Sequence, residues 1–136
     1  MRGGYLRGYL AIVGAGLLLQ GATSLLLLDG LDVNVTRFHG LVAMDDRHAG
    51  LHVVWGLFLL AVIARRPSQR TLIGVGSFFG VFYLLLGLLG IAVHDPFGLM
   101  LGWGENGFHL IVGPLALILV LHDVREVQRP ALSEAK

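Results

Sequence analysis

The chain has 136 residues, a formal net charge of +1 and no cysteine. The lack of cysteine excludes disulfides and thiolate metal sites, and the low charge excludes a basic surface that could neutralise a nucleic-acid backbone. Hydrophobic residues make up 55% of the chain and charged residues only 14%, with a mean hydropathy of +0.76, whereas soluble domains carry about 25% charged residues. The 20 glycines are scattered through the apolar runs, as is typical of membrane helices. The composition therefore predicts an all-α, polytopic membrane protein.

Four apolar segments are long enough to cross a bilayer, which takes about 17–25 helical residues. Arg2 and Arg7 precede the first segment as in a signal peptide, but its apolar run reaches Leu28 without an A-x-A cleavage site, so we expect it to be retained. We predict one transmembrane domain over residues 1–122, followed by a tail at 123–136. The predicted spans are 9–28, 48–64, 71–93 and 105–122.

Basic residues concentrate on one side of this four-span topology. The N-terminus, the "RRPSQR" turn and the tail hold eight of the ten Lys and Arg residues: Arg2, Arg7, Arg65, Arg66, Arg70, Arg125, Arg129 and Lys136. The two opposite loops hold Arg37 and Arg47, and they carry six acidic residues: Asp29, Asp32, Asp45, Asp46, Asp95 and Glu105. The positive-inside rule therefore predicts that both termini and the tail are cytoplasmic.

Two short stretches share the pattern G-x-H-x-x-x-G: "GLHVVWG" at 50–56 and "GFHLIVG" at 107–113. Each lies in the second helix of a predicted hairpin, residues 1–64 and 71–122, which also has a long Gly-containing first helix and an acidic outer loop. Both hairpins begin on the same side, so we predict a parallel repeat about an axis normal to the membrane. This symmetry brings His52 and His109 to a similar depth in a four-helix bundle.

The fourth segment carries the pattern N-x-x-H-x-x-x-G in "ENGFHLIVG", with Asn106, His109 and Gly113. This pattern near the start of an even-numbered membrane helix resembles small four-helix bacterial membrane proteins of the domain of unknown function 4383 family. The second segment, "AGLHVVWG", keeps the histidine and the glycine but has Ala49 in place of the asparagine. The resemblance covers the hairpin architecture along most of the chain. It implies a protein of the bacterial cytoplasmic membrane and no known activity.

His48 and His52 are four residues apart and therefore share a helical face, as do Glu105 and His109. If the repeat holds, three imidazoles and one carboxylate converge near the outer ends of the second and fourth helices. Facing bundle helices that supply nitrogen and oxygen ligands suit Zn, Cu, Fe or Ni. We therefore predict a metal site whose ligands are His48, His52, Glu105 and His109.

The same histidines allow two other interpretations. His52 and His109 could ligate a haem iron, with Gly56 and Gly113 leaving room for the macrocycle and with propionates met by an outer arginine, Arg37 or Arg47. Alternatively, the histidines only donate hydrogen bonds between helices near the headgroup boundary, at little cost.

The sequence contains no phosphate-binding loop, nucleophile elbow or intramembrane acid pair, so we predict a non-enzymatic protein. Gly76 and Gly80 form a GxxxG, which predicts close helix packing within the bundle, in a homo-oligomer or in a larger membrane complex. An accessory or assembly subunit of such a complex is the alternative to a metal- or haem-binding protein. The apolar, Gly-rich segment 94–105 is expected to cap the bundle over the histidines or to lie in the membrane interface.

Overall fold

A computed structural model of the chain describes residues 4–28, 44–93 and 95–133. Within these ranges the chain forms helices and no strand. The helices are α1 (Gly4–Thr23), which continues as a π-helical turn (Ser24–Leu28), α2 (Asp46–Ala64), α3 (Gln69–Val93) and α4 (Trp103–Ser133). A short 3-10 turn, Pro96–Gly98, lies between α3 and α4. The predicted all-helical fold is confirmed, and all four helices are long and apolar enough to cross a membrane.

Each helix begins before its predicted span, and α4 also continues well past residue 122. Apolar character ends before helical hydrogen bonding does, so charged and polar residues such as Arg7, Gln69 and Arg125 occupy the outer turns. The predicted tail is helical as far as Ser133, and residues 123–129 contain no glycine or proline that would end the helix before Pro130. The shortest helix, α2, has 19 residues and is about 28 Å long, which still matches a hydrocarbon core of about 30 Å.

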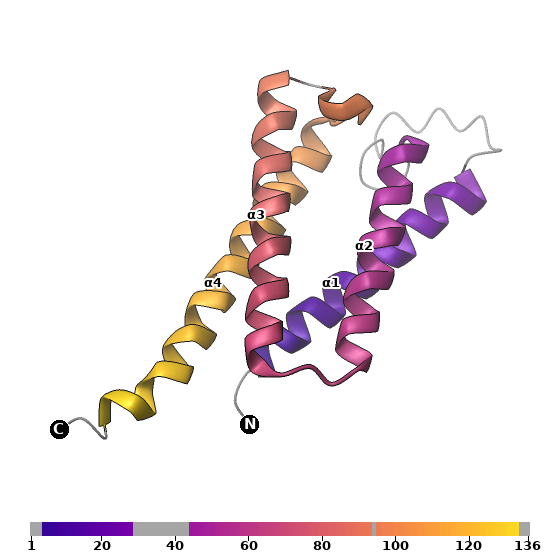
Figure 1. The fold of residues 1–136 in the computed structure, drawn as a ribbon. Coiled ribbons are helices and arrows are strands. Elements are labelled where there is room, and N and C mark those ends of the chain that lie inside the picture. The colour runs from indigo at the N-terminus through magenta and orange to yellow at the C-terminus, as the bar shows by residue number, and fades with distance from the viewer. Residues whose placement is uncertain (1–3, 29–43, 94, 134–136) are drawn as a thin grey trace.

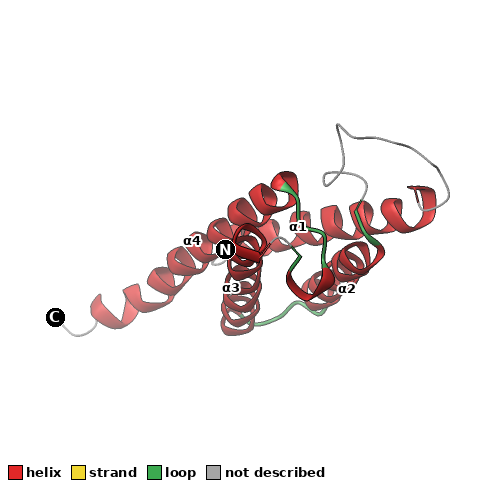
Figure 2. Cartoon of the chain, turned by 90° about the horizontal axis from the view of Figure 1, so that it is seen from above, coloured by secondary structure: helices red, strands yellow, loops and turns green. Residues whose placement is uncertain are grey.

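The helices alternate in direction, so the described ends of α1 and α4 nearest the two termini lie at the same end of the molecule (Figure 1). We call the opposite end, which contains Ser24–Leu28, Asp45 and residues 95–102, the distal end. α1 packs mainly against α2, and α3 packs mainly against α4, so the chain consists of two helical hairpins. The hairpins meet through contacts of α1 with α3 and α4. Seen from above, α3 is nearly end-on whereas α1 and α4 run obliquely across the view (Figure 2).

Within the first hairpin, α1 and α2 touch backbone to backbone at glycines. A Cβ atom added at Gly56 would lie 2.6 Å from the backbone nitrogen of Leu18 and 2.8 Å from the carbonyl oxygen of Gly14. No side chain fits in that space, so glycine is required there for the two helices to approach this closely.

The second hairpin has the same contact. A Cβ atom added at Gly113 would lie 2.6 Å from the backbone nitrogen of Leu84 and 2.8 Å from the carbonyl oxygen of Gly80. One turn before Gly80, a Cβ atom at Gly76 would lie 2.9 Å from Val120 of α4 and close to α1. Gly76 and Gly80 therefore pack against helices of their own chain.

Aromatic side chains fill the space between the hairpins. Trp55 of α2 lies with its ring centroid 5.3 Å from that of Phe79 of α3, and Phe79 lies 4.5 Å from Tyr83. All three are buried. The hydroxyl of Tyr9 in α1 donates a hydrogen bond of 2.6 Å to the carbonyl of Val112 in α4. These contacts join the two hairpins.

Asp45 fixes the distal end of α2. One carboxylate oxygen accepts hydrogen bonds of 3.1 Å from the backbone N–H groups of Arg47 and His48, and so caps the helix. The other oxygen accepts a 3.1 Å hydrogen bond from the N–H of Met100, in the connection between α3 and α4. One side chain thus ties the first turn of α2 to the second hairpin.

The connection between α3 and α4 folds onto the bundle. Leu99 and Leu101 are buried and pack with Leu86 of α3, whereas Phe97 and Trp103 are exposed. This agrees with the expectation that so apolar a segment packs on the bundle end rather than in water.

Candidate metal centre

Three histidines from two helices meet in the interior at the distal end. His48 and His52 lie one turn apart on α2, with ring centroids 4.6 Å apart. His109 enters from α4, and its ring centroid is 5.3 Å from that of His48 and 6.2 Å from that of His52. The exposed fractions of the three side chains are 0%, 1% and 0%. The two G-x-H-x-x-x-G stretches do bring their histidines together, with His48 as the third member.

The three rings can supply one ligand nitrogen each. One ring nitrogen of every histidine lies within 4.8 Å of a ring nitrogen of the other two. Three nitrogens bound to a tetrahedral zinc ion at about 2.0–2.1 Å are about 3.4 Å apart. Small side-chain rotations therefore suffice to bring the rings to coordinating distance.

None of the six nitrogens of these rings has a hydrogen-bond partner within the described part of the chain. The buried polar groups of folded proteins are normally paired, and leaving one unpaired costs about 1–3 kcal/mol. A set of hydrogen bonds between helices would show a carbonyl or amide next to each ring, and the described residues provide none. The three rings therefore form a group that could hold a metal ion.

Glu105, the fourth predicted ligand, is placed beside the histidines but does not belong to the closest group. Its side chain is 2% exposed, and both carboxylate oxygens lack a hydrogen-bond partner among the described residues. Glu105 and Asp45 both lie near enough to His48 for electrostatic interaction. Glu105 lies one turn before His109 on α4, as His48 lies one turn before His52 on α2.

Two aromatic rings lie against the histidines, Tyr83 from α3 and Phe108 from α4. The Tyr83 ring centroid is 5.2 Å from that of His109 and 6.3 Å from that of His52. Phe108 lies 6.0 Å from His52 and 5.9 Å from His109. The Tyr83 hydroxyl is also buried and has no partner within the described ranges. Tyr83 is a site residue that sequence reasoning missed, because nothing in its local pattern distinguishes it from a core aromatic.

Gly56 and Gly113, predicted to leave room for a haem, do not border an open space. Each faces the backbone of the partner helix in its own hairpin, at less than 3 Å from an added Cβ atom. The two glycines serve close helix packing, one turn below His52 and His109 respectively.

The other polar residues named from the sequence lie around the centre rather than in it. Asp45 caps α2, while Asp46, Arg47 and Asp95 are exposed. The Arg47 guanidinium lies against Gly98, where it would overlap an added Cβ atom. Five residues named from the sequence lie outside the described residues: Arg2, Asp29, Asp32, Arg37 and Lys136.

A scan against protein-family models and searches of curated proteins and of solved structures found no match for this chain. No relative therefore indicates the chemistry of the centre, which is inferred from the residues that form it.

Proposed function

We propose that this chain is a small, non-enzymatic integral membrane protein that binds one divalent transition-metal ion between its two hairpins. The observation that carries the proposal is the group of three buried imidazoles from α2 and α4 whose ring nitrogens converge without hydrogen-bond partners in the described structure. A metal ion bound to His48, His52 and His109 forms a bond to one nitrogen of each ring. These bonds offset the free energy lost by burying nitrogens without hydrogen-bond partners.

Zinc is the ion that fits this donor set best. Three histidine nitrogens with one oxygen ligand form a common tetrahedral zinc site, and Glu105 is the proposed fourth ligand. A buried carboxylate without a partner is strongly destabilising unless it faces a cation. Cu, Fe and Ni accept the same donors, so the identity of the bound ion is decided by metal analysis.

A haem has less support than a metal ion. A haem plane lies between its two axial imidazoles and extends sideways beyond them, so it needs open space around the ligating nitrogens. Tyr83 and Phe108 instead pack against His52 and His109. The space in front of Gly56 and Gly113 is taken by the backbone of α1 and α3.

The proposed location is the bacterial cytoplasmic membrane, with both termini in the cytoplasm. Basic residues at the described end of the bundle near the termini support this orientation: Arg7, Arg65, Arg66, Arg70 and Arg125. Acidic residues prevail at the distal end: Asp45, Asp46, Asp95 and Glu105. The metal centre then lies near the outer surface.

We also propose that the two hairpins are repeats of one unit. The matching glycine contacts support this, since they pair Gly14 with Gly80, Leu18 with Leu84, and Gly56 with Gly113. The same correspondence pairs His52 with His109 and His48 with Glu105. Membership of the domain of unknown function 4383 family likewise stays a proposal, supported by the pattern around Asn106, His109 and Gly113.

The alternative, an accessory subunit that docks onto a homo-oligomer or a larger complex through Gly76 and Gly80, has weaker support. Gly76 already packs against α1 and α4 of the same chain, and Gly80 packs against α4. A bulky residue at either position is expected to disturb the bundle itself, and so it would not isolate a partner surface.

The test is elemental analysis of protein purified in mild detergent, together with zinc binding measured by competition with a chromophoric chelator. We expect about one tightly bound metal ion per chain, and its loss in His52→Ala and His109→Ala. His122→Ala is the matched control, because His122 is half-exposed on α4 far from the distal end. A folded wild type that takes up no zinc, copper, iron or nickel would refute the proposal. A Soret band in its absorption spectrum would favour the haem.

A further inference from the structure

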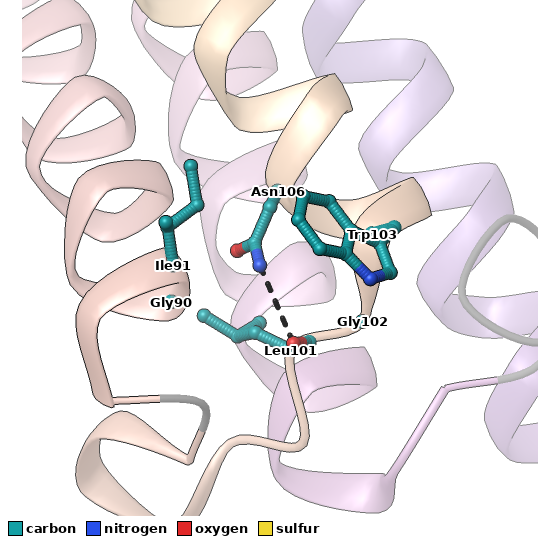
Figure 3. A pocket seen from close by; sticks show the side chains of 6 residues that line it. All are labelled: Gly90, Ile91, Leu101, Gly102, Trp103 and Asn106. Atoms are coloured by element: carbon teal, nitrogen blue, oxygen red, sulfur yellow. Dashed lines mark hydrogen bonds between the residues drawn. The ribbon is translucent and has the colours of Figure 1, made fainter.

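A cavity of about 140 Å³ opens at the distal end beside the metal centre. Its lining comes from α3, the connection and the first turn of α4 (Figure 3): Gly90, Ile91, Leu101, Gly102, Trp103 and Asn106. Ile91, Gly102 and Trp103 are exposed, whereas Gly90, Leu101 and Asn106 are buried. The cavity therefore has both exposed and buried lining residues.

Asn106 provides a polar group on the inner wall. Its side chain is 5% exposed, and its Nδ2 donates a hydrogen bond of 3.4 Å to the carbonyl of Leu101 (Figure 3). Its Oδ1 has no partner within the described ranges. A methyl group added at Gly90 would overlap this oxygen. The wall thus accommodates an acceptor oxygen that the protein itself leaves unused.

The cavity lies close to the metal centre along α4, since its lining residue Asn106 directly follows Glu105. The Glu105 carboxylate lies against Gly102, 2.9 Å from where a Cβ atom would be. Asn106 precedes His109 by three residues, about 4.5 Å along α4. On α3, Gly90 faces Asn106. Gly87 lies one turn deeper, and a Cβ atom added there would be 3.1 Å from the Cβ atom of His109. The cavity lies one helical turn outward of the histidines.

We propose that this cavity is the access route by which a partly hydrated divalent transition-metal ion reaches His48, His52 and His109 from the distal side. The proposal rests on the proposed metal-binding function. Asn106 Oδ1 and the Glu105 carboxylate replace water ligands on the ion one turn before the imidazoles do. A cation that crossed an apolar wall would lose its hydration without compensation.

The size and the lining of the cavity suit this role. Its volume is several times the roughly 30 Å³ that a water molecule occupies in the liquid, so the ion keeps part of its hydration shell on entering. Two other cavities are lined by hydrophobic side chains alone and offer no oxygen ligand: Val54, Trp55, Phe58 and Phe78 line one, and Phe82, Leu85, Leu86, Leu89 and Phe97 line the other.

The test follows Co²⁺ uptake and release by stopped-flow absorption in detergent-purified protein. Asn106→Leu keeps the size of the side chain and removes the oxygen. Gly107→Ala is the matched control, since it adds a methyl group to the neighbouring residue, where nothing lies within 4 Å. An access route changes the rates of association and dissociation of the ion by the same factor, so it leaves the dissociation constant unchanged. We therefore expect Asn106→Leu to slow association and dissociation by the same factor, about tenfold for one lost polar contact, with Kd within about twofold of wild type.

Rates in Asn106→Leu equal to those in wild type and Gly107→Ala would overturn the access route and leave the metal-binding proposal intact. So would a variant that only dissociates faster, because Asn106 would then stabilise the bound state. A wild type that binds neither Co²⁺ nor Zn²⁺ would overturn the proposed function, and the route with it. Melting curves of all three proteins without metal verify that the substitutions leave the fold in place.

Discussion

Replacing His109 by leucine distinguishes metal binding from hydrogen bonding between helices. In the absence of metal, the two roles predict changes of opposite sign in the free energy of unfolding. His109 is fully buried, and neither ring nitrogen has a partner in the described structure. Each such group costs about 1–3 kcal/mol, and a change of shape in a packed core costs up to about 1.5 kcal/mol. In the absence of metal, we therefore expect His109→Leu to be more stable than wild type by about 1 kcal/mol.

Zinc reverses this order. At a free zinc concentration of 100 times Kd, binding stabilises wild type by about 2.7 kcal/mol, whereas a variant that lacks one of three histidine ligands gains little. We expect wild type to be the more stable protein under these conditions. The assay is unfolding of both proteins in mild detergent, followed by circular dichroism, with a chelator and then with zinc. His122→Leu serves as the control for zinc, because it removes a half-exposed imidazole that pairs with Asp123, so zinc should leave its stability relative to wild type unchanged.

The reasoning is refuted if His109→Leu is less stable than wild type both with the chelator and with zinc. Histidines that hydrogen-bond between helices give that result, since their loss leaves partners unpaired whatever the metal concentration.

Three further predictions concern the same fold. Gly113→Ala would place a methyl group 2.6 Å from a backbone nitrogen and should destabilise the protein by about 1–3 kcal/mol. Gly107→Ala should change stability by less than about 0.5 kcal/mol. Unfolding curves of the two variants measure the difference, and equal effects would contradict the close backbone contact. Glu105→Gln should weaken zinc binding about 10–100-fold, as measured by chelator competition against the exposed control Asp46→Asn; unchanged affinity would remove Glu105 from the ligand set. Zinc affinity should fall on acidification once protons compete for the buried imidazole nitrogens, as chelator competition over a series of pH values measures; zinc that stays bound in strong acid would exclude histidine ligands.

The helices and the meeting of the histidines were predictable from sequence, because both follow from local spacing. Runs of apolar residues predict helices, and the four-residue interval puts His48 and His52 on one face. The repeated G-x-H-x-x-x-G pattern placed His109 at the depth of His52. The structure bears out this proximity and leaves ligation to experiment.

The composition of the closest group was not predictable, because it depends on how the hairpins cross. His48 belongs to the group of three, whereas its counterpart Glu105 stands beside it. Contacts distant in sequence decide this, such as the hydrogen bond from Met100 to Asp45 at the start of α2. The sequence-based haem interpretation took Gly56 and Gly113 as spacers, since the pattern alone does not reveal the α1 and α3 backbone in front of them.

The division of the bundle into two hairpins also bears on how the protein assembles. α1 and α2 hold His48 and His52, and α3 and α4 hold His109, so neither half of the chain contains the complete centre. Packing is dense inside each hairpin and sparser between them. A metal ion coordinated by all three histidines would therefore cross-link the two halves of the chain. Such an ion would hold the two hairpins in their final arrangement. A chain whose hairpins have not yet docked would lack a complete set of ligands and could not bind it.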